Sequence, residues 1–272
     1  MLIDTHCHIH DRGTYNFAIS RQQISKKFLR DHPDFPHEPE DFVPEKIIAR
    51  AHENNVMKMI CIGTSHEDSL TACEFAKKFA SDGVYWSYGI HPDEANAPNP
   101  KPTFLEDDLR PIAIGEVGLD YRDGESNRIA QMKLFEQMLQ LAKDNNLPLI
   151  FHVRDAFSDF FSMLDNFPDA RGVVHSFSDS AENLKKSLDR GFYIGVNGLA
   201  TFAPELPTAN IPLERILLET DAPFLTPTPF RGTINEPARI QEICAYISKI
   251  KEIPEKEISR ITTENAERLF QI

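Results

Sequence analysis

Short apolar runs alternate along the chain with longer stretches in which apolar residues recur every three or four positions. The runs are nearly continuously apolar and rich in β-branched residues, as expected for strands buried on both faces of a parallel sheet. Eight of them occur in order: Leu2–His6, Met57–Gly63, Val84–Gly89, Ile112–Glu116, Leu149–His152, Gly172–His175, Phe192–Val196 and Arg215–Glu219.

Helical periodicity fills most of the intervals between these runs. The spacing predicts helices over Pro44–Asn54, His66–Ala80, Ser126–Asn145, Asp155–Asn166, Ser180–Arg190, Glu236–Lys251 and Pro254–Phe270. Ser180 is expected to be an N-cap and Gly191 to follow a helix end. A short helix is expected near Phe104–Leu109, whereas Pro204–Asn210 has no clear pattern. Alternating strands and helices imply right-handed parallel crossovers, so we predict one (β/α)8 TIM barrel over residues 1–272.

Apolar positions within the predicted helices indicate which faces are buried. Leu70 begins such a repeat in its helix, and Ile129 begins another in the longest helix. In the last helix, Ile258, Ile261 and Leu269 should pack against the outside of the barrel.

One long connection interrupts this rhythm directly after the first strand. Residues 11–43 are polar, contain proline and histidine, and form an insertion in the predicted barrel. A stretch of this size without structure is unusual inside a compact domain and is typically functional or disordered. Its middle, Ile19–Leu29, has the apolar spacing of one short helix.

Composition limits the classes of function. The length of 272 residues is close to the about 250 residues of a typical (β/α)8 domain. Acidic side chains outnumber basic ones, and the formal net charge is −13. This charge excludes a broad basic face for nucleic acid, because binding by counterion release needs Lys and Arg on phosphates. A local phosphate site at bound cations remains compatible with it.

The four cysteines, Cys7, Cys61, Cys73 and Cys244, contain no C-x-x-C pair. This pattern favours buried free thiols in a reducing compartment. The first residues lack a basic and apolar leader, and no stretch approaches the roughly 18 apolar residues of a membrane span. We therefore expect a cytoplasmic protein without membrane association, and infer no obligate protein partner.

Metal-ligand-type side chains stand at the ends of the predicted strands: His6, His8, Glu116, His152, His175 and Asp221. Two imidazoles at positions i and i+2 of a strand point to the same face, so both can reach one ion. The carboxyl ends of the strands are where a (β/α)8 barrel builds its active site. Each residue alone would more often be structural, but burying all six without metal would leave polar groups in need of partners. The series therefore predicts a metal centre at that end of the barrel.

Seven motifs follow one another along the chain: Asp4-Thr5-His6-Cys7-His8, Gly89-Ile90-His91-Pro92, Gly115–Tyr121, Pro148–Asp155, His175-Ser176-Phe177, Glu219–Leu225 and Arg231–Pro237. In this order they resemble the TatD-related hydrolases, a branch of the metal-dependent, amidohydrolase-type barrels. The resemblance covers the chain apart from residues 11–43. Seven motifs in the right order are far more specific than any one of them.

The resemblance implies two divalent metal ions. The six strand-end residues would divide around a shared carboxylate: His6, His8 and Asp221 on one ion, Glu116 bridging, and His152 and His175 on the other. These ligand types suit Zn²⁺, Mn²⁺ or Mg²⁺, so the identity of the ions stays open. Glu116 and Asp221 are the expected catalytic residues, with Asp221 orienting or deprotonating a metal-bound water.

Three further residues are candidate substrate contacts. By the resemblance, His91 faces the substrate. Arg154 follows His152 at the same strand face, where it would hold a phosphate or pair with Asp120 or Asp155 as support. Arg231 lies in the loop after the last strand, a usual place for ligand contacts in barrels.

The leading interpretation is a deoxyribonuclease that cleaves phosphodiesters of DNA ends or single strands by metal-activated water. DNA is then the expected substrate. The same metals could instead serve a carboxylic ester or amide hydrolase, such as a D-aminoacyl-tRNA deacylase, because specificity lies in loops. A non-catalytic metal-binding barrel is a third alternative.

The insertion leaves from the His6/His8 strand end, so it begins at the mouth of the active site. We predict that it partly covers the metal centre, with Phe17, Phe28 or Phe35 available to stack on a base. A passive insertion is the alternative.

Overall fold

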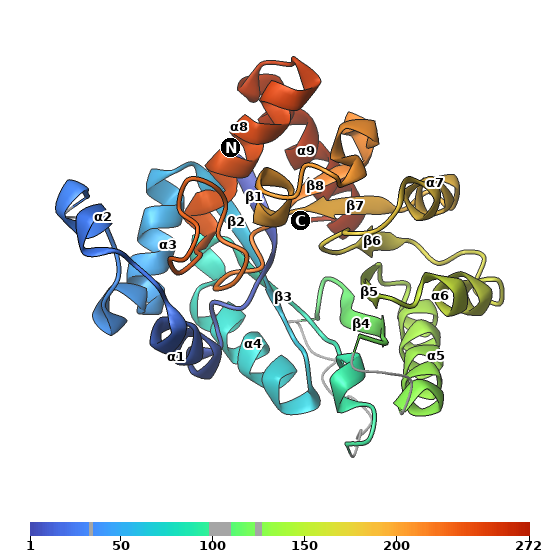
Figure 1. Ribbon diagram of the computed structural model, residues 1–272. Helices are drawn as coiled ribbons and strands as arrows, with labels where there is room; N and C mark the ends of the chain where they lie inside the picture. Colours follow the sequence, from blue (N-terminus) through green and yellow to red (C-terminus); the bar gives the residue numbers. More distant parts are fainter. Residues whose placement is uncertain (33–34, 98–109, 123–126) are drawn as a thin grey trace.

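The computed structural model describes residues 1–32, 35–97, 110–122 and 127–272, and in these ranges the chain forms eight parallel strands. They are β1 Leu2–Cys7, β2 Val56–Ile62, β3 Val84–Ser87, β4 Ile114–Asp120, β5 Leu149–Arg154, β6 Gly172–Val174, β7 Tyr193–Val196 and β8 Ile216–Leu218. Helices follow the strands in order around the molecule (Figure 1). The predicted (β/α)8 fold is confirmed, and β4 runs past its expected end because its pairing with β5 continues to Asp120.

The strands form two sheets that join at both edges. One sheet has the order β1-β2-β3 and the other β4-β5-β6-β7-β8. Isolated parallel bridges connect Tyr88 with Ile114 and Cys7 with Ala222. At the second seam the amide of His8 donates to the carbonyl of Ala222 over 2.8 Å, and the amide of Asp221 donates to the carbonyl of His6 over 2.8 Å. The first and last strands therefore meet, which completes the barrel.

The outer helices agree closely with the predicted ones. They are α3 Pro44–Glu53, α4 His66–Lys78, α5 Arg128–Asn145, α6 Phe157–Leu164, α7 Ala181–Asp189, α8 Ile240–Lys251 and α9 Glu255–Phe270. Ser180 caps α7 by accepting from the amide of Asn183, and Gly191 follows its end with φ of 80°. None of the helices in the described ranges has the length and apolar character that crossing a membrane requires.

Short 3-10 turns make up several connections. They are η1 Pro39–Phe42, η2 Ala80–Asp82, η3 Pro92–Glu94, η6 Gly198–Thr201, η7 Pro207–Asn210, η8 Leu213–Arg215 and η9 Pro237–Arg239. The segment 204–210, which has no clear sequence pattern, thus ends in one such turn. The helix expected near Phe104–Leu109 lies outside the described residues.

The insertion folds into two helices rather than one. They are α1 Arg12–Arg21 and α2 Lys26–Asp31, so the prediction of a single helix over Ile19–Leu29 was wrong. The reason lies in two N-caps: Asp11 accepts from the amide of Thr14, and Ser25 accepts from the amide of Phe28. In Figure 1 both helices lie beside α3, at the left of the barrel.

The barrel interior contains its own apolar cluster. Ile150, Val173 and Leu217 belong to this cluster. Each of them lies two residues before a polar residue at the carboxyl end of its strand, so the apolar and the polar residue share one face of the strand. Leu269 and Phe270 of α9 pack into the same cluster. The end of α9 therefore caps the interior, and the expectation that Leu269 lies on the outside was wrong.

Two apolar residues expected at buried helix faces are exposed. The exposed fraction is 40% for Leu70 and 85% for Ile129. In α5 the buried stripe includes Leu134, Phe135 and Met138, and Ile129 lies in the first turn beyond that stripe. The prediction from hydrophobicity alone therefore assigned two residues to buried helix faces that do not include them.

Two glycines with positive φ give a matched test of packing between β4 and β5. At Gly118, with φ of 152°, an added Cβ would lie 1.9 Å from the carbonyl oxygen of His152. At Gly191, with φ of 80°, a Cβ would meet no described atom within 4 Å. We expect Gly118→Ala to lower the free energy of unfolding by at least about 3 kcal/mol, from backbone strain plus overpacking. Gly191→Ala should cost about 1–2 kcal/mol, from strain alone. Equal losses in urea unfolding would contradict this packing.

Candidate metal centre

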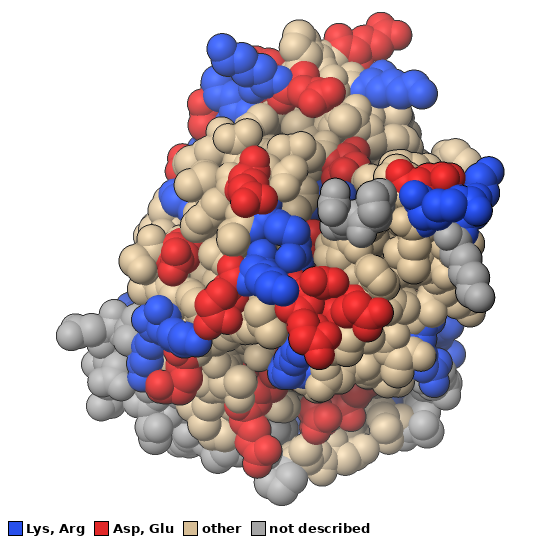
Figure 2. All heavy atoms as spheres, turned by 90° about the vertical axis from the view of Figure 1, so that its left-hand side faces the viewer, with Lys and Arg blue, Asp and Glu red and all other residues tan. Residues whose placement is uncertain are grey.

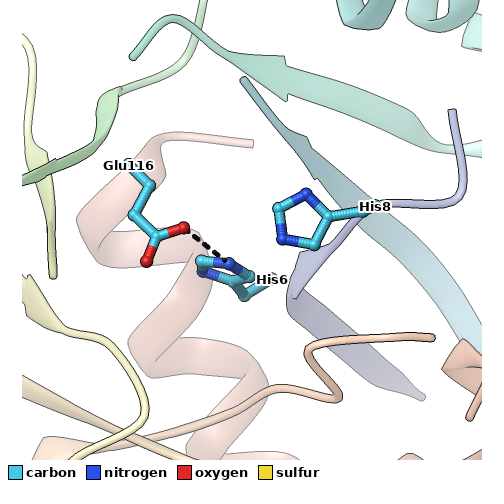
Figure 3. Close-up of side chains that lie close together, drawn as sticks. All are labelled: His6, His8 and Glu116. Carbon is cyan, nitrogen blue, oxygen red and sulfur yellow. Dashed lines mark ion pairs between the residues drawn. The ribbon is translucent and has the colours of Figure 1, made fainter. Parts of the chain in front are cut away.

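Three of the strand-end residues, from β1 and β4, lie together at the carboxyl end of the barrel. His6 is in β1, His8 follows it, and Glu116 is in β4; their side chains point toward one another (Figure 3). The Nε2 atom of His6 lies 3.5 Å from Oε2 of Glu116 and 3.7 Å from Oδ1 of Asp221. The same Asp221 oxygen is 3.5 Å from Nε2 of His8. These separations place one nitrogen or oxygen from each residue around a common point.

The remaining two histidines approach the other carboxylate oxygen of Glu116. Its Oε1 atom is 2.6 Å from Nδ1 of His152 and 3.7 Å from Nε2 of His175. The rings of His6 and His175 are stacked with centroids 3.5 Å apart. All six sequence-predicted residues are thus brought together, and three of the four imidazoles contact the Glu116 carboxylate.

Local backbone geometry explains why these side chains converge. Positions two apart on a strand share a face, which directs His6 and His8 to one side of β1 and its extension. Asp221 has φ of 57°, a left-handed conformation that is uncommon outside glycine. Its amide is bonded to the carbonyl of His6, so the seam of the barrel holds its carboxylate next to both histidines.

Charges inside the cluster are strongly coupled. Burial would raise the pKa of Glu116, but the imidazoles of His175 and His152 outweigh this effect and hold the pKa well below its usual range. Burial acts to lower the pKa of His152, but Glu116 and Asp120 raise it to about 9. Burial and the neighbouring His175 lower the pKa of His6. The cluster therefore stabilises an ionised carboxylate beside a neutral His6 imidazole, as metal binding needs, whereas His152 would have to release a proton when an ion binds.

His6 shows directly that the cluster suits a cation. Both of its ring nitrogens are buried and lack a hydrogen-bond partner among the described residues. Buried polar atoms normally have partners, because desolvation without one is costly. Its Nε2 atom faces two carboxylates at distances too long for hydrogen bonds. A divalent ion between Nε2 and these carboxylates would give that nitrogen and both carboxylates a partner.

Residues behind the cluster hold two of the histidines in place. Oε1 of Glu219 lies 3.0 Å from Nδ1 of His175, and it accepts from the amide of Ser176 over 2.7 Å. Oδ2 of Asp120 lies 2.8 Å from Nε2 of His152. Carboxylates on the second ring nitrogen commonly orient metal-binding histidines.

Sequence reasoning missed two of these supports. Asp120 was considered only as a partner of Arg154, and Asn197, which donates to Oε1 of Glu219 over 3.2 Å, was not considered. The position of Asp120 in the same motif as Glu116 was the available signal. Asn197 stands at the end of β7 but belongs to none of the motifs.

The candidate substrate contacts are distributed unevenly. The His91 ring is 4.4 Å from that of His152, and His91 lines the open cavity of about 280 Å³ in front of Glu116. Arg154 is partly exposed and lies 3.8 Å from Oδ2 of Asp120, which corresponds to the supporting alternative. Arg231 does not line this cavity, and its guanidinium carbon lies 3.4 Å from the centroid of the Phe202 ring.

A parallel (β/α)8 barrel with histidines and carboxylates gathered at the carboxyl ends of its strands defines an amidohydrolase-type, metal-dependent hydrolase. A family model described as TatD related DNase matches residues 3–271. The chain therefore belongs to the TatD family of metal-dependent hydrolases, as its motifs predicted.

Known relatives agree with this assignment. A Bacillus subtilis protein named as an uncharacterized metal-dependent hydrolase, YabD, is 36% identical over 84% of this chain and 92% of its own length. A Cronobacter sakazakii protein named 3'-5' ssDNA/RNA exonuclease TatD is 32% identical over 83% of this chain and 91% of its own length. The crystal structure of an Escherichia coli TatD homologue, YjjV, has a TM-score of 0.80 and 26% identity, covering 100% of this chain and 98% of that one.

Proposed function

We propose that this protein is a deoxyribonuclease that uses two divalent ions to cleave phosphodiesters at DNA ends or in single strands. The observation that carries the proposal is the Glu116 carboxylate, whose two oxygens face different imidazoles: Oε2 faces His6, and Oε1 faces His152 and His175. A carboxylate in that position can bridge a pair of ions. Two ions about 3.5–4 Å apart are a recurrent arrangement for phosphodiester hydrolysis.

The donor set fits such ions. His6, His8 and Asp221 would hold one of them, His152 and His175 the other, with Glu116 shared. Bound divalent ions would supply polarisation of the phosphoryl oxygens and activation of water at neutral pH. Nitrogen and carboxylate ligands are compatible with Zn²⁺ and Mn²⁺, and with Mg²⁺ if waters complete its shell.

Asp221 is the proposed proton acceptor. Burial alone would raise the pKa of its carboxyl, but the nearby imidazoles of His8, His175 and His6 outweigh that effect and lower the pKa. The group is therefore ionised at neutral pH and can accept the proton of an attacking water. His91, at the open side of the cavity, is placed to orient the phosphodiester.

Nucleic acid as substrate is supported by the family description and by the exonuclease named among the relatives. The net charge of −13 does not exclude a nucleic acid substrate, because a local site at bound cations can still hold phosphate. On the face in Figure 2, Lys and Arg side chains are interspersed with Asp and Glu rather than gathered into a basic field. Affinity for a polyanion must therefore arise at the metal centre and its immediate surroundings.

The proposal is tested by a parallel screen of the metal-loaded protein. Single-stranded DNA, an aryl phosphodiester and a D-aminoacyl-tRNA are offered at equal concentration. We expect hydrolysis of both phosphodiesters, release of mononucleotides or short oligonucleotides from DNA, and no deacylation. Deacylation without phosphodiester cleavage would replace the proposal with the carboxylic ester alternative, and turnover of none of the three would favour the non-catalytic barrel.

Metal content provides a second test. We expect about two divalent ions per chain after reconstitution and desalting, because six ligand-type residues converge around Glu116. Elemental analysis by mass spectrometry measures this directly. A His152→Ala, His175→Ala double variant should retain about one ion. A limit of one ion in the unaltered protein would contradict a bridged pair.

Isosteric changes at the two carboxylates test their roles. Glu116→Gln or Asp221→Asn should lower kcat on the aryl phosphodiester by at least roughly 100-fold, because each removes a negative charge required for the ions or the proton transfer. Glu214→Gln, in η8 on the barrel exterior, serves as the matched control. Near-normal kcat at saturating metal in either site variant would exclude that residue from catalysis.

A further inference from the structure

A second groove lies next to the open cavity in front of Glu116, which is called the metal cavity below. It has a volume of about 360 Å³ and lies between α1 and the loop that follows β8. Phe224 lines both spaces, so the groove adjoins the metal cavity at this side chain. The other lining residues used below are Phe17, Arg21 and Arg231.

One face of α1 runs along both spaces. Asp11 and Thr14 line the metal cavity, and Phe17 and Arg21 line the second groove. These residues are three or four positions apart, the spacing at which side chains share one helix face. From Asp11 to Arg21 the helix rises about 15 Å, so the face spans the room of several nucleotides of a single strand.

The opposite wall is held firmly in place. The amide of Gln23 donates to the carbonyl of Gly232 over 2.9 Å, which joins the end of α1 to the loop. Within the loop, the hydroxyl of Thr226 donates to the carbonyl of Thr233, and the amide group of Asn235 donates to the carbonyl of Phe224. The groove is therefore formed before any ligand arrives.

Its chemistry is unusual for this surface. Six large hydrophobic side chains are exposed within the described ranges, and the two aromatic ones among them, Phe17 at 51% and Phe224 at 40%, both line the groove. The guanidinium carbon of Arg21 lies 4.7 Å from the Phe17 ring centroid, and Arg231 lies over the ring of Phe202. Exposed rings combined with arginines are the elements with which proteins bind single-stranded nucleic acid.

The other aromatic residues of the insertion have a structural role instead. Phe35 is buried, and both Phe28 and Phe35 pack against Phe230, with ring centroids 6.4 and 5.6 Å away. Arg239 lies over the Phe230 ring at 4.0 Å. Phe35 is therefore not available for stacking, Phe28 is half-buried, and of the three only Phe17 lines the groove.

We propose that this groove holds the nucleotides of a single strand that lie next to the cleaved phosphodiester. Phe17 and Phe224 stack on bases, and Arg21 and Arg231 neutralise phosphates. The inference rests on the proposed nuclease function, and it assigns the insertion a specific part in it. The insertion is then neither a cover over the metals nor a passive loop, but one wall of a substrate track.

A length series tests the track. The kcat/KM values are measured on oligothymidylates of two to eight nucleotides for the unaltered protein, Phe17→Ala and Ile129→Ala. Ile129 is an exposed apolar residue on α5, outside the groove. For Phe17→Ala we expect a loss that grows with length and reaches roughly tenfold or more on the longest substrates. Ile129→Ala should follow the unaltered protein. A loss equal at every length, or none, would overturn the proposal.

A binding measurement separates this inference from the nuclease function. Fluorescence anisotropy with a labelled octathymidylate in EDTA reports affinity without cleavage. Arg21→Ala should reduce the steepness of the logarithmic salt dependence by about 0.7, the value for one phosphate contact on a single strand. Arg30→Ala, the same change at a 76%-exposed side chain on α2, is the matched control and should leave the slope unchanged.

The combined outcomes are decisive in either direction. Binding that weakens in Phe17→Ala and Arg21→Ala supports the track even if the protein cleaves no DNA, in which case only the proposed nuclease function fails. Cleavage without any length dependence supports the nuclease function and overturns the track. Absence of measurable binding by the unaltered protein also overturns it.

Discussion

A carboxylate stays ionised inside a protein only if cations or hydrogen-bond donors surround it, and Glu116 is the buried carboxylate on which this site depends. Imidazoles from β1, from β5 and from the end of β6 lie within 4 Å of its two oxygens. The imidazoles of His152 and His175 are in turn oriented by Asp120 and Glu219. The imidazoles compensate the charge of Glu116, and Asp120 and Glu219 compensate the charge of the imidazoles. The cluster therefore functions as a unit and not as separate ligands.

The barrel provides this arrangement because each inward strand face carries apolar side chains in the interior and polar side chains at its carboxyl end. Ile150 and Leu217 fill the interior, and residues two positions later on each strand reach the polar end. The end of α9 closes the opposite side of that interior through Leu269 and Phe270. Because one mouth is sealed by apolar side chains, ligands have access from the other mouth, where the loops and α1 shape the approach.

Much of this was predictable because it depends on short-range patterns. Strand alternation and the position of a residue at a strand end were enough to bring His6, His8 and Asp221 into one prediction, although Asp221 is more than 200 residues away in the sequence. What could not be predicted depends on three-dimensional neighbours. Phe17 and Phe35 are the same residue type in the same polar segment, and only packing against Phe230 removes Phe35 from the surface. The competing caps at Asp11 and Ser25 likewise decide the helices, and they outweigh the apolar spacing between them.

The seam between β1 and β8 has a consequence for the chain while it is being synthesised. The bond from the Asp221 amide to the His6 carbonyl joins the two ends of the fold at the metal centre itself. During synthesis, which proceeds from the N-terminus, His6 and His8 leave the ribosome long before Asp221 exists. A nascent chain therefore cannot bring the six strand-end residues together before the last strand has been made. The cluster is complete only when the last strand closes the ring, so any reaction that needs all of its residues has to wait for barrel closure.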